Sequence, residues 1–320
     1  ASRCGNHPIL RCYAGTDNLE RFAKMLIKTI NNGWSAIPIF WFNKMDGRGP
    51  HDLITSLNEH LNLISYHADV KLPVEILESH HWGMRWAHDT IVVTSAILGA
   101  LICKRLGVEN YIHQYMFNVP PQTSHKNDLA KMLCVKELLE EISDYNFNVF
   151  HQTRAGLPSF PNDLDLAKGQ LASSTALQMQ INPDIIHVVS FSEPNHAANY
   201  EDVIQSAKIV HQIIKNNLDA PKQTFDKDVI YRKEELKAES KFLIDFINKN
   251  GDIIDPIYLH SLAKSGILDA PMLKNNKYVP GKSETLLFEG GFYPSLGGKK
   301  ISEFERIAKI CDKSTFSLDI

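Results

Sequence analysis

The feature that most constrains the fold of this chain is a repeated alternation of short β-rich segments with longer helical patterns. The β-rich segments span residues 9–13, 36–42, 70–77, 111–117, 147–153 and 185–191. A helical pattern follows each one, at residues 19–31, 51–66, 90–106, 126–142, 164–180 and 201–216. The connections are short enough for neighbouring parallel strands. The pattern therefore predicts an α/β protein with a parallel sheet and helices packed outside it.

The number of units leaves two architectures open. A closed TIM-type barrel needs eight β/α units, whereas an open sheet of six strands is normally covered by helices on both faces. No G-x-G-x-x-G follows an expected strand, so a dinucleotide-binding fold has no direct support. We interpret residues 1–217 as units of a (β/α) TIM-type barrel. Residues 218–320 are expected to form a C-terminal extension, with helices at 222–250 and 252–264 and an irregular cap.

Composition argues against several classes of protein. The net charge of −3, with 22% charged and 43% hydrophobic residues, is ordinary for a globular chain and shows no nucleic-acid footprint. The most apolar stretch, residues 90–103, is shorter than the roughly 20 residues that cross a bilayer. Five scattered cysteines without a C-x-x-C pair indicate reduced thiols. No signal peptide is recognisable, so we expect a cytoplasmic protein without a membrane partner.

Polar residues at the carboxyl ends of the expected strands are the candidates for chemistry, because ligands bind there in parallel α/β folds. Following the order of the strands, they are Arg11; Asn43 and Lys44; Glu75 and Glu78; Gln114 and Asn118; His151, Gln152 and Arg154; Ser190, Ser192 and Glu193; and His196.

Arg11 is the most demanding of these residues, because an arginine on an apolar strand must find an anion. Two interpretations stay open for it: a bidentate grip on a substrate carboxylate, or an internal salt bridge. The run 150–156 (FHQTRAG) places several polar groups at a strand end before a glycine turn, which favours a functional role. Glu193, before a proline, suits a helix cap or a ligand hydroxyl equally well.

His80, His81 and His88 raise the question of a metal site. Histidine pairs in loops usually face solvent, and no cysteine or carboxylate spacing accompanies these three. We therefore expect solvent-facing histidines and no metal ion.

Several motifs, in the right order along nearly the whole chain, carry a family resemblance. They are VFHQ at 149–152 with GLP at 156–158, the segment 185–193, AESK at 238–241 and AKSGILDAP at 263–271. Upstream, Arg11 followed by GTD at 15–17 and GW at 33–34 fits the same order. This set resembles the large subunit of coenzyme B12-dependent glutamate mutase (methylaspartate mutase).

The resemblance implies a (β/α)8 barrel of which the first two strands are lacking here. Either a separate polypeptide supplies them or the fold closes differently. It also implies adenosylcobalamin as cofactor, bound mainly by a small partner subunit that carries D-x-H-x-x-G, a motif absent from this sequence. A heteromeric, oligomeric complex is the expected assembly.

The resemblance assigns roles to residues unevenly. Arg11 matches one of three arginines that hold the substrate carboxylates, and His151 matches a position near substrate and corrin. Glu193, flanked by Ser190 and Ser192, matches the glutamate that holds the adenosyl ribose. Where the family has two lysines this chain has Ile185 and Val189, and Pro38 falls near the position of the glutamate that meets the substrate amino group. Tyrosines of the family fall near Lys44 and Arg48.

These departures imply a small amino acid or carboxylic acid other than glutamate as substrate. The leading hypothesis is an adenosylcobalamin-dependent carbon-skeleton mutase, a radical isomerase. Its substrate-binding residues would be Arg11, Asn43, Glu75, His151, Gln152 and Arg154. A B12-independent barrel lyase or isomerase, and a non-catalytic assembly subunit, are the alternatives.

Overall fold

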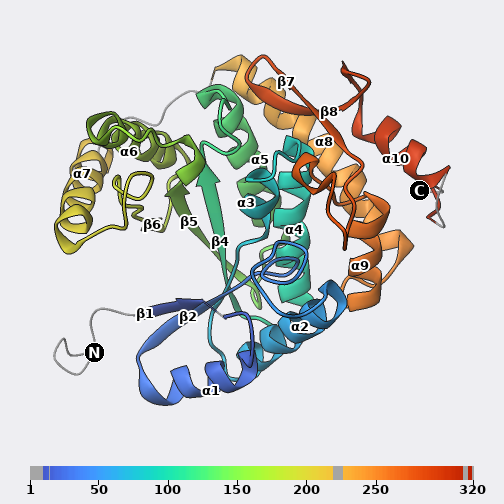
Figure 1. The fold of residues 1–320 in the computed structure, drawn as a ribbon, viewed down its shortest axis with the longest axis horizontal. Helices are drawn as coiled ribbons and strands as arrows, with labels where there is room; N and C mark the ends of the chain where they lie inside the picture. The colour runs from blue at the N-terminus through green and yellow to red at the C-terminus, as the bar shows by residue number, and fades with distance from the viewer. Residues whose placement is uncertain (1–9, 14, 219–225, 313–315, 319–320) are drawn as a thin grey trace.

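A curled, six-stranded parallel sheet forms the centre of the computed structural model, which describes residues 10–13, 15–218, 226–312 and 316–318. The strands follow each other in sequence order from β1 to β6, so β1 and β6 are its two edges (Figure 1). This is an open half barrel, compatible with a TIM-like fold. The strands are β1 (Leu10–Tyr13), β2 (Asn32–Ile37), β3 (Val74–Ile76), β4 (Asn110–Phe117), β5 (Asn148–Ala155) and β6 (Ile185–His187).

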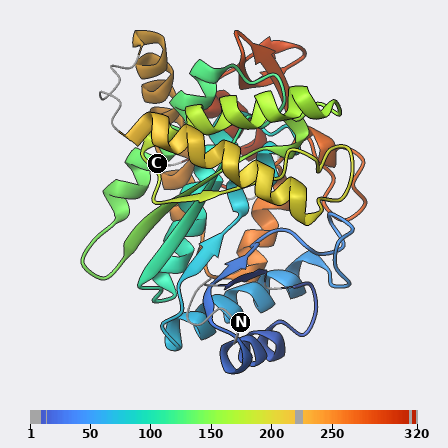
Figure 2. The same cartoon turned by 90° about the vertical axis from the view of Figure 1, so that its left-hand side faces the viewer.

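Helices follow the strands as the alternation predicts. In order they are α1 (Leu19–Thr29), α2 (Leu53–Asp69), α3 (Glu78–Gly83), α4 (Asp89–Arg105), α5 (His125–Ile142), α6 (Leu164–Gln178) and α7 (Tyr200–Leu218). Side chains that accept a backbone N–H fix several helix starts: Asp52 for α2, Ser124 for α5 and Asp163 for α6. Figure 2 shows α6 and α7 side by side. The short helix α3 occupies a segment that we expected to be a loop.

The C-terminal extension lies behind the first helix layer. Its elements are α8 (Lys227–Asn250), α9 (Pro256–Ser265), β7 (Glu284–Phe288), β8 (Gly291–Leu296), β9 (Lys299–Lys300) and α10 (Glu303–Cys311). Helix α8 packs on α4 and α5, and α9 packs on α2. One buried apolar cluster contains Ile97 and Leu138 from the β/α units together with Phe246 and Leu262 from the extension. The two segments therefore share a core.

The irregular cap that we expected is wrong in part, because β7, β8 and β9 form an antiparallel sheet. Each connection is a two-residue turn with both residues at positive φ: Glu289 and Gly290 first, then Gly297 and Gly298. Such turns match the twist of hairpin strands and select glycine. The glycine pairs in this region therefore mark hairpins and not irregular chain.

The second strand lies earlier than the apolar run 36–42 suggested. Strand β2 ends at Ile37, because Pro38 has no N–H to donate to a neighbouring strand. The amides of Ile39 and Phe40 donate instead to the buried carboxylate of Glu78, at 3.0 and 3.2 Å. A buried side chain thus replaces a strand partner, and the remaining run is a buried loop.

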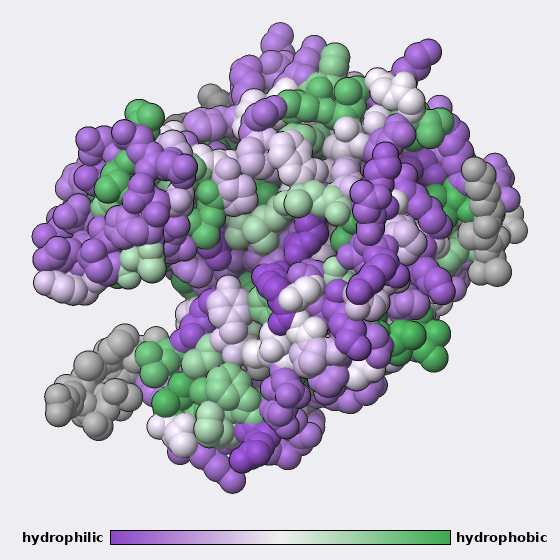
Figure 3. Space-filling model, in the orientation of Figure 1, coloured by the Kyte–Doolittle hydropathy of each residue, from purple (hydrophilic) through white to green (hydrophobic). Residues whose placement is uncertain are grey.

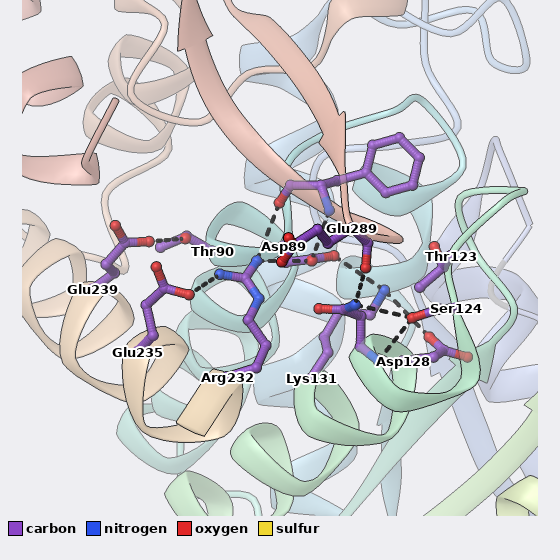
Figure 4. Close-up of polar contacts among 12 residues, drawn as sticks. Asp89, Thr90, Thr123, Ser124, Asp128, Lys131, Arg232, Glu235, Glu239 and Glu289 are labelled. Atoms are coloured by element: carbon purple, nitrogen blue, oxygen red, sulfur yellow. Dashed lines mark hydrogen bonds and ion pairs between the residues drawn. The ribbon is translucent and has the colours of Figure 1, made fainter. Parts of the chain in front are cut away.

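A buried set of charges joins the extension to the helix layer (Figure 4). The amine of Lys131 lies 3.3 Å from both Asp89 and Asp128, and all three side chains are fully buried. Arg232 on α8 lies 3.0 Å from the other Asp89 oxygen, which also accepts the amide of Phe292 on β8 at 3.0 Å. Each charge has an opposite partner, so the set is balanced.

We predict that Lys131→Met lowers the free energy of unfolding by about 3–5 kcal/mol, because it leaves the buried carboxylate of Asp128 without a cation and removes one of the two cations at Asp89. Urea unfolding followed by circular dichroism measures this change. The matched control is Lys168→Met, which removes the exposed pair with Asp165 and should change stability by less than about 0.5 kcal/mol. Equal effects of the two substitutions would contradict a structural role for the buried set.

Candidate functional site

The sheet has two faces of different character. Ile76, Tyr115 and Phe117 lie in the large apolar cluster with residues of α4 and α5. The residues that alternate with them point to the opposite side, which we call the inner face. Strand registers place these residues on it: Arg11, Trp34, Glu75, Gln114, Gln152, Arg154 and His187. Figure 3 shows the surface notched on the side where the sheet is open between β1 and β6.

Glu75 is the centre of the polar contacts on the inner face. Its carboxylate is completely buried and accepts two hydrogen bonds from Arg11, Nε at 2.6 Å and Nη2 at 2.5 Å. It also accepts from Trp34 Nε1 at 2.7 Å and from Gln114 Nε2 at 2.6 Å. Of the two interpretations of Arg11, the structure has the internal salt bridge. Burial lowers the pKa of Arg11, but its bonds to Glu75 outweigh that effect and the pKa is raised.

Arg154, two positions beyond Gln152, differs from Arg11 because it has no carboxylate partner in the described structure. It is only 9% exposed, yet none of its nitrogens lies within ion-pair distance of a carboxylate among the residues that the structure describes. Among the described residues, the one hydrogen bond of its side chain runs from Nε to the carbonyl of Ala155 at 3.4 Å. Burial lowers the pKa of Arg154 and outweighs the opposite effects of Tyr13 and Glu193; the charge of Arg11 lowers the pKa further. A buried guanidinium without an anion is a costly arrangement.

Three polar side-chain atoms of the inner face have no hydrogen-bond partner in the described structure. They are Gln114 Oε1, Gln152 Nε2 and His187 Nδ1, and each of these atoms is buried. His187 pairs with Arg154 in the β5–β6 register. Burial lowers the pKa of His187 to about 3, and the positive charges of Arg154 and Arg11 act in the same direction. The imidazole is therefore neutral, and the group combines a cation, an amide donor and a neutral ring.

The structure brings Arg11, Glu75, Gln152 and Arg154 together but places two other predicted residues elsewhere. His151 lies on the helix side of the sheet, where its Nδ1 is 2.8 Å from the hydroxyl of Tyr115. Asn43 is fully buried in the loop after β2, donating to the carbonyl of Phe40 at 2.9 Å and accepting from the amide of Met45 at 2.8 Å. Because side chains alternate along a strand, His151 points to the opposite side of the sheet from Gln152 and Arg154. The polar side-chain atoms of Asn43 bind the backbone of its own loop.

The residues expected at the adenosyl ribose differ in what they offer. The hydroxyls of Ser190 and Ser192 are buried and lie 2.9 Å from each other, and that of Ser206 donates to Ser190 at 3.4 Å. Glu193 is exposed, and one carboxylate oxygen accepts the amide of Ser190 at 3.3 Å. The three serine hydroxyls therefore bond to one another just after β6. Glu193 retains an oxygen that fits a ribose hydroxyl.

The expectation of solvent-facing histidines is wrong. His80, His81 and His88 are 4, 3 and 0% exposed, and burial lowers the pKa of each. The first two belong to α3, whose unexpected helical turn packs them inside. In the described part of the chain, no three His, Cys, Asp or Glu side chains gather as a metal ion would require.

Comparisons with known proteins add no further constraint: no protein-family model and no curated protein matches the chain. Across the residues whose structure is described, none of the helices combines the length and apolar character needed to span a bilayer.

We predict that stability falls as the pH drops below about 6.5, because buried neutral histidines bind protons only after unfolding. The pKa is lowered to about 3 for His187 and His113 and to about 4 for His60. Between these values and 6.5 the unfolded chain binds more protons, so the unfolding free energy rises with pH. His187→Gln should reduce this slope by at most about 1.4 kcal/mol per pH unit near pH 5.

Urea unfolding at a series of pH values between 4 and 7 measures the slope. The matched control is His211→Gln, at an exposed position on α7, which should leave the pH dependence unchanged. A slope that His187→Gln does not alter would contradict burial of a neutral imidazole.

Proposed function

We propose that this protein is the substrate-binding subunit of an enzyme acting on a small carboxylic acid or amino acid, with Arg154 as the anchor for the carboxylate. The observation that carries the proposal is the buried guanidinium of Arg154 without a counter-ion in the described structure. Perturbed, desolvated cations in the concavity of a fold mark functional sites more often than structural ones.

The neighbours of Arg154 support a planar anion as ligand. A guanidinium presents parallel N–H groups that match the two oxygens of a carboxylate. Gln152 Nε2 is a further unpaired donor on the same strand, and His187 Nδ1 is unpaired on the next one. The ion pair of Arg11 with Glu75 borders this group and is electrically balanced. An added carboxylate would therefore neutralise Arg154 without competing for Arg11.

For the reaction class we propose a carbon-skeleton mutase that uses adenosylcobalamin brought mainly by a partner subunit with D-x-H-x-x-G. The resemblance of the ordered motifs to the large subunit of glutamate mutase supports this choice. When bound, the cofactor supplies a radical that abstracts and later returns a substrate hydrogen. Arg154 and Gln152 would orient the substrate, Glu193 would accept a ribose hydroxyl, and the sheet would exclude water.

The open sheet supports a further part of this proposal, a chain that completes the barrel. Strands β1 and β6 each have one neighbour in the described sheet, so one edge of each carries unpaired backbone groups. Two added strands would close a barrel of eight. Tyr200 and Val203 at the start of α7, the helix that follows β6, are 73 and 51% exposed.

A B12-independent lyase or isomerase is the second candidate. The observation that favours it is the internal bonding of Ser190 and Ser192, which leaves Glu193 as the one expected ribose contact with a free oxygen. This candidate keeps the same carboxylate anchor. Turnover of a carboxylate in the absence of any corrin would select it.

We predict that Arg154→Met weakens binding of the preferred carboxylate at least about 30-fold, equal to about 2 kcal/mol. The same change should raise the unfolding free energy of the ligand-free protein by about 1 kcal/mol, because it removes an unpaired buried charge. Calorimetric titration with a panel of small mono- and dicarboxylates gives the affinity, and urea unfolding gives the stability.

Arg21→Met is the matched control, because Arg21 is exposed on α1 and should affect neither quantity. Loss of stability in Arg154→Met would show that Arg154 is structural and would refute the proposed anchor.

We predict that the chain shifts the visible spectrum of adenosylcobalamin when a D-x-H-x-x-G partner is present, and that Glu193→Gln weakens this complex several-fold. Titration in the presence and absence of candidate partner proteins measures it. Ser190→Ala, which leaves Glu193 in place, is the control. Absence of corrin binding with every partner would refute the cofactor while leaving the carboxylate site to be judged by calorimetry.

A further inference from the structure

A cavity lies in the C-terminal extension, between the end of α9, the β7–β8 hairpin and α10. Figure 1 shows α9 and α10 on its right. Its volume is about 510 Å³, within the range of sites that hold small organic ligands. None of the inner-face residues lines it. It is therefore separate from the carboxylate site proposed above.

The cavity wall concentrates positive charge from three different elements. Lys264 ends α9, Lys282 precedes β7, and Lys309 belongs to α10; all three line the cavity. No described carboxylate lies within ion-pair distance of any of these amines. The partners of the Lys282 amine are the carbonyls of Lys264 and Ser265, at 3.5 and 3.4 Å. The one acidic lining residue, Glu284, accepts the amide of Gly297 at 2.8 Å.

Buried hydrogen bonds and an ion pair fix the backbone of the cavity wall. Arg306 donates to the carbonyls of Gly266 and Ile267 at 2.6 and 2.8 Å and pairs with Glu303. Asp269 is buried and accepts the amides of Lys282 and Ser283 at 2.5 and 2.7 Å. Arg306 thus fixes the chain just after Lys264, and Asp269 fixes the segment that carries Lys282.

Two hydroxyls of the wall are available to a ligand. The Ser283 oxygen is buried and has no hydrogen-bond partner. Ser295 on β8 is 7% exposed and lines the cavity, and its hydroxyl makes no hydrogen bond among the described contacts. The apolar part of the wall includes Leu296, Ile301 and Phe316. The cavity is thus lined by both charged donors and apolar side chains.

We propose that this cavity binds an organic phosphate, a phosphate ester with an apolar or aromatic body. Three lysine amines arranged around a space suit a compact dianion, because each acts as a point charge with freely rotating donors. A carboxylate would instead favour a guanidinium fork, and Arg306 has committed its donors to Glu303 and two carbonyls. Ser283 and Ser295 add hydroxyl donors, and the apolar wall receives the body of the ester.

The test is calorimetric titration of the full chain with phenyl phosphate, inorganic phosphate and phenol. We expect phenyl phosphate to bind with a Kd below about 1 mM and inorganic phosphate and phenol to bind at least about 10-fold more weakly, since each lacks one half of the recognition. The double variant Lys264→Met/Lys309→Met should weaken phenyl phosphate binding at least about 10-fold.

Two controls separate this cavity from other basic surfaces. Lys299→Met removes an exposed amine on β9, outside the cavity, and Arg154→Met removes the inner-face cation; each should leave phenyl phosphate affinity within about twofold. The proposal is overturned by absence of phenyl phosphate binding at about 10 mM, by equal affinity for inorganic phosphate, or by equal loss in either control. Loss in Arg154→Met would place the anion on the inner face.

Discussion

The buried carboxylate of Glu75 is the constraint on which the inner face of the sheet depends. A charge removed from water must be matched by donors, and here four hydrogen bonds reach it from β1, β2 and β4. Glu75 thereby links the four strands β1 to β4 on the side opposite the helices. Arg11, whose position on an apolar strand first suggested that it binds a substrate carboxylate, is instead paired with Glu75. It also leaves Arg154 as the cation on this face without an anion in the described structure.

The same principle separates the structural charges of the molecule from the candidate functional ones. Asp89 and Lys131 are buried as deeply as Glu75, Arg232 is nearly so, and each has a partner of opposite charge. They tie α4, α5, α8 and β8 together, and they give the extension a fixed place behind the helix layer. Arg154, in contrast, is buried with no carboxylate within ion-pair distance among the described residues. Incomplete pairing of a buried charge, rather than burial itself, is the reason why we single out Arg154 as a candidate.

Much of the fold was predictable because each β/α unit carries its own periodicity. Five of the six strands lie within or beside the expected segments, and β2 departs because Pro38 ends the ladder and Glu78 binds the amides beyond it. The site was less predictable. The twofold alternation of β5 could have separated His151 from Gln152 and Arg154. His187 lies on an apolar strand, and its position beside Arg154 on the inner face follows only from the β5–β6 register. No local sequence pattern predicts the hydrogen bond between the hydroxyls of Ser190 and Ser192.

An unpaired buried arginine and an open-edged sheet have a common physical consequence: both make the isolated chain less stable than its core allows. A ligand that neutralised Arg154 would recover electrostatic energy in the folded state alone, so ligand binding and folding would be thermodynamically linked. At a ligand concentration 100 times Kd the gain is about 2.7 kcal/mol, comparable to the contribution of a well-packed core side chain. Pairing of the β1 or β6 edge with another chain would act in the same sense. The proposed substrate and the proposed strand-supplying partner would therefore each stabilise the form of the protein that binds the other, provided that both contact the inner face.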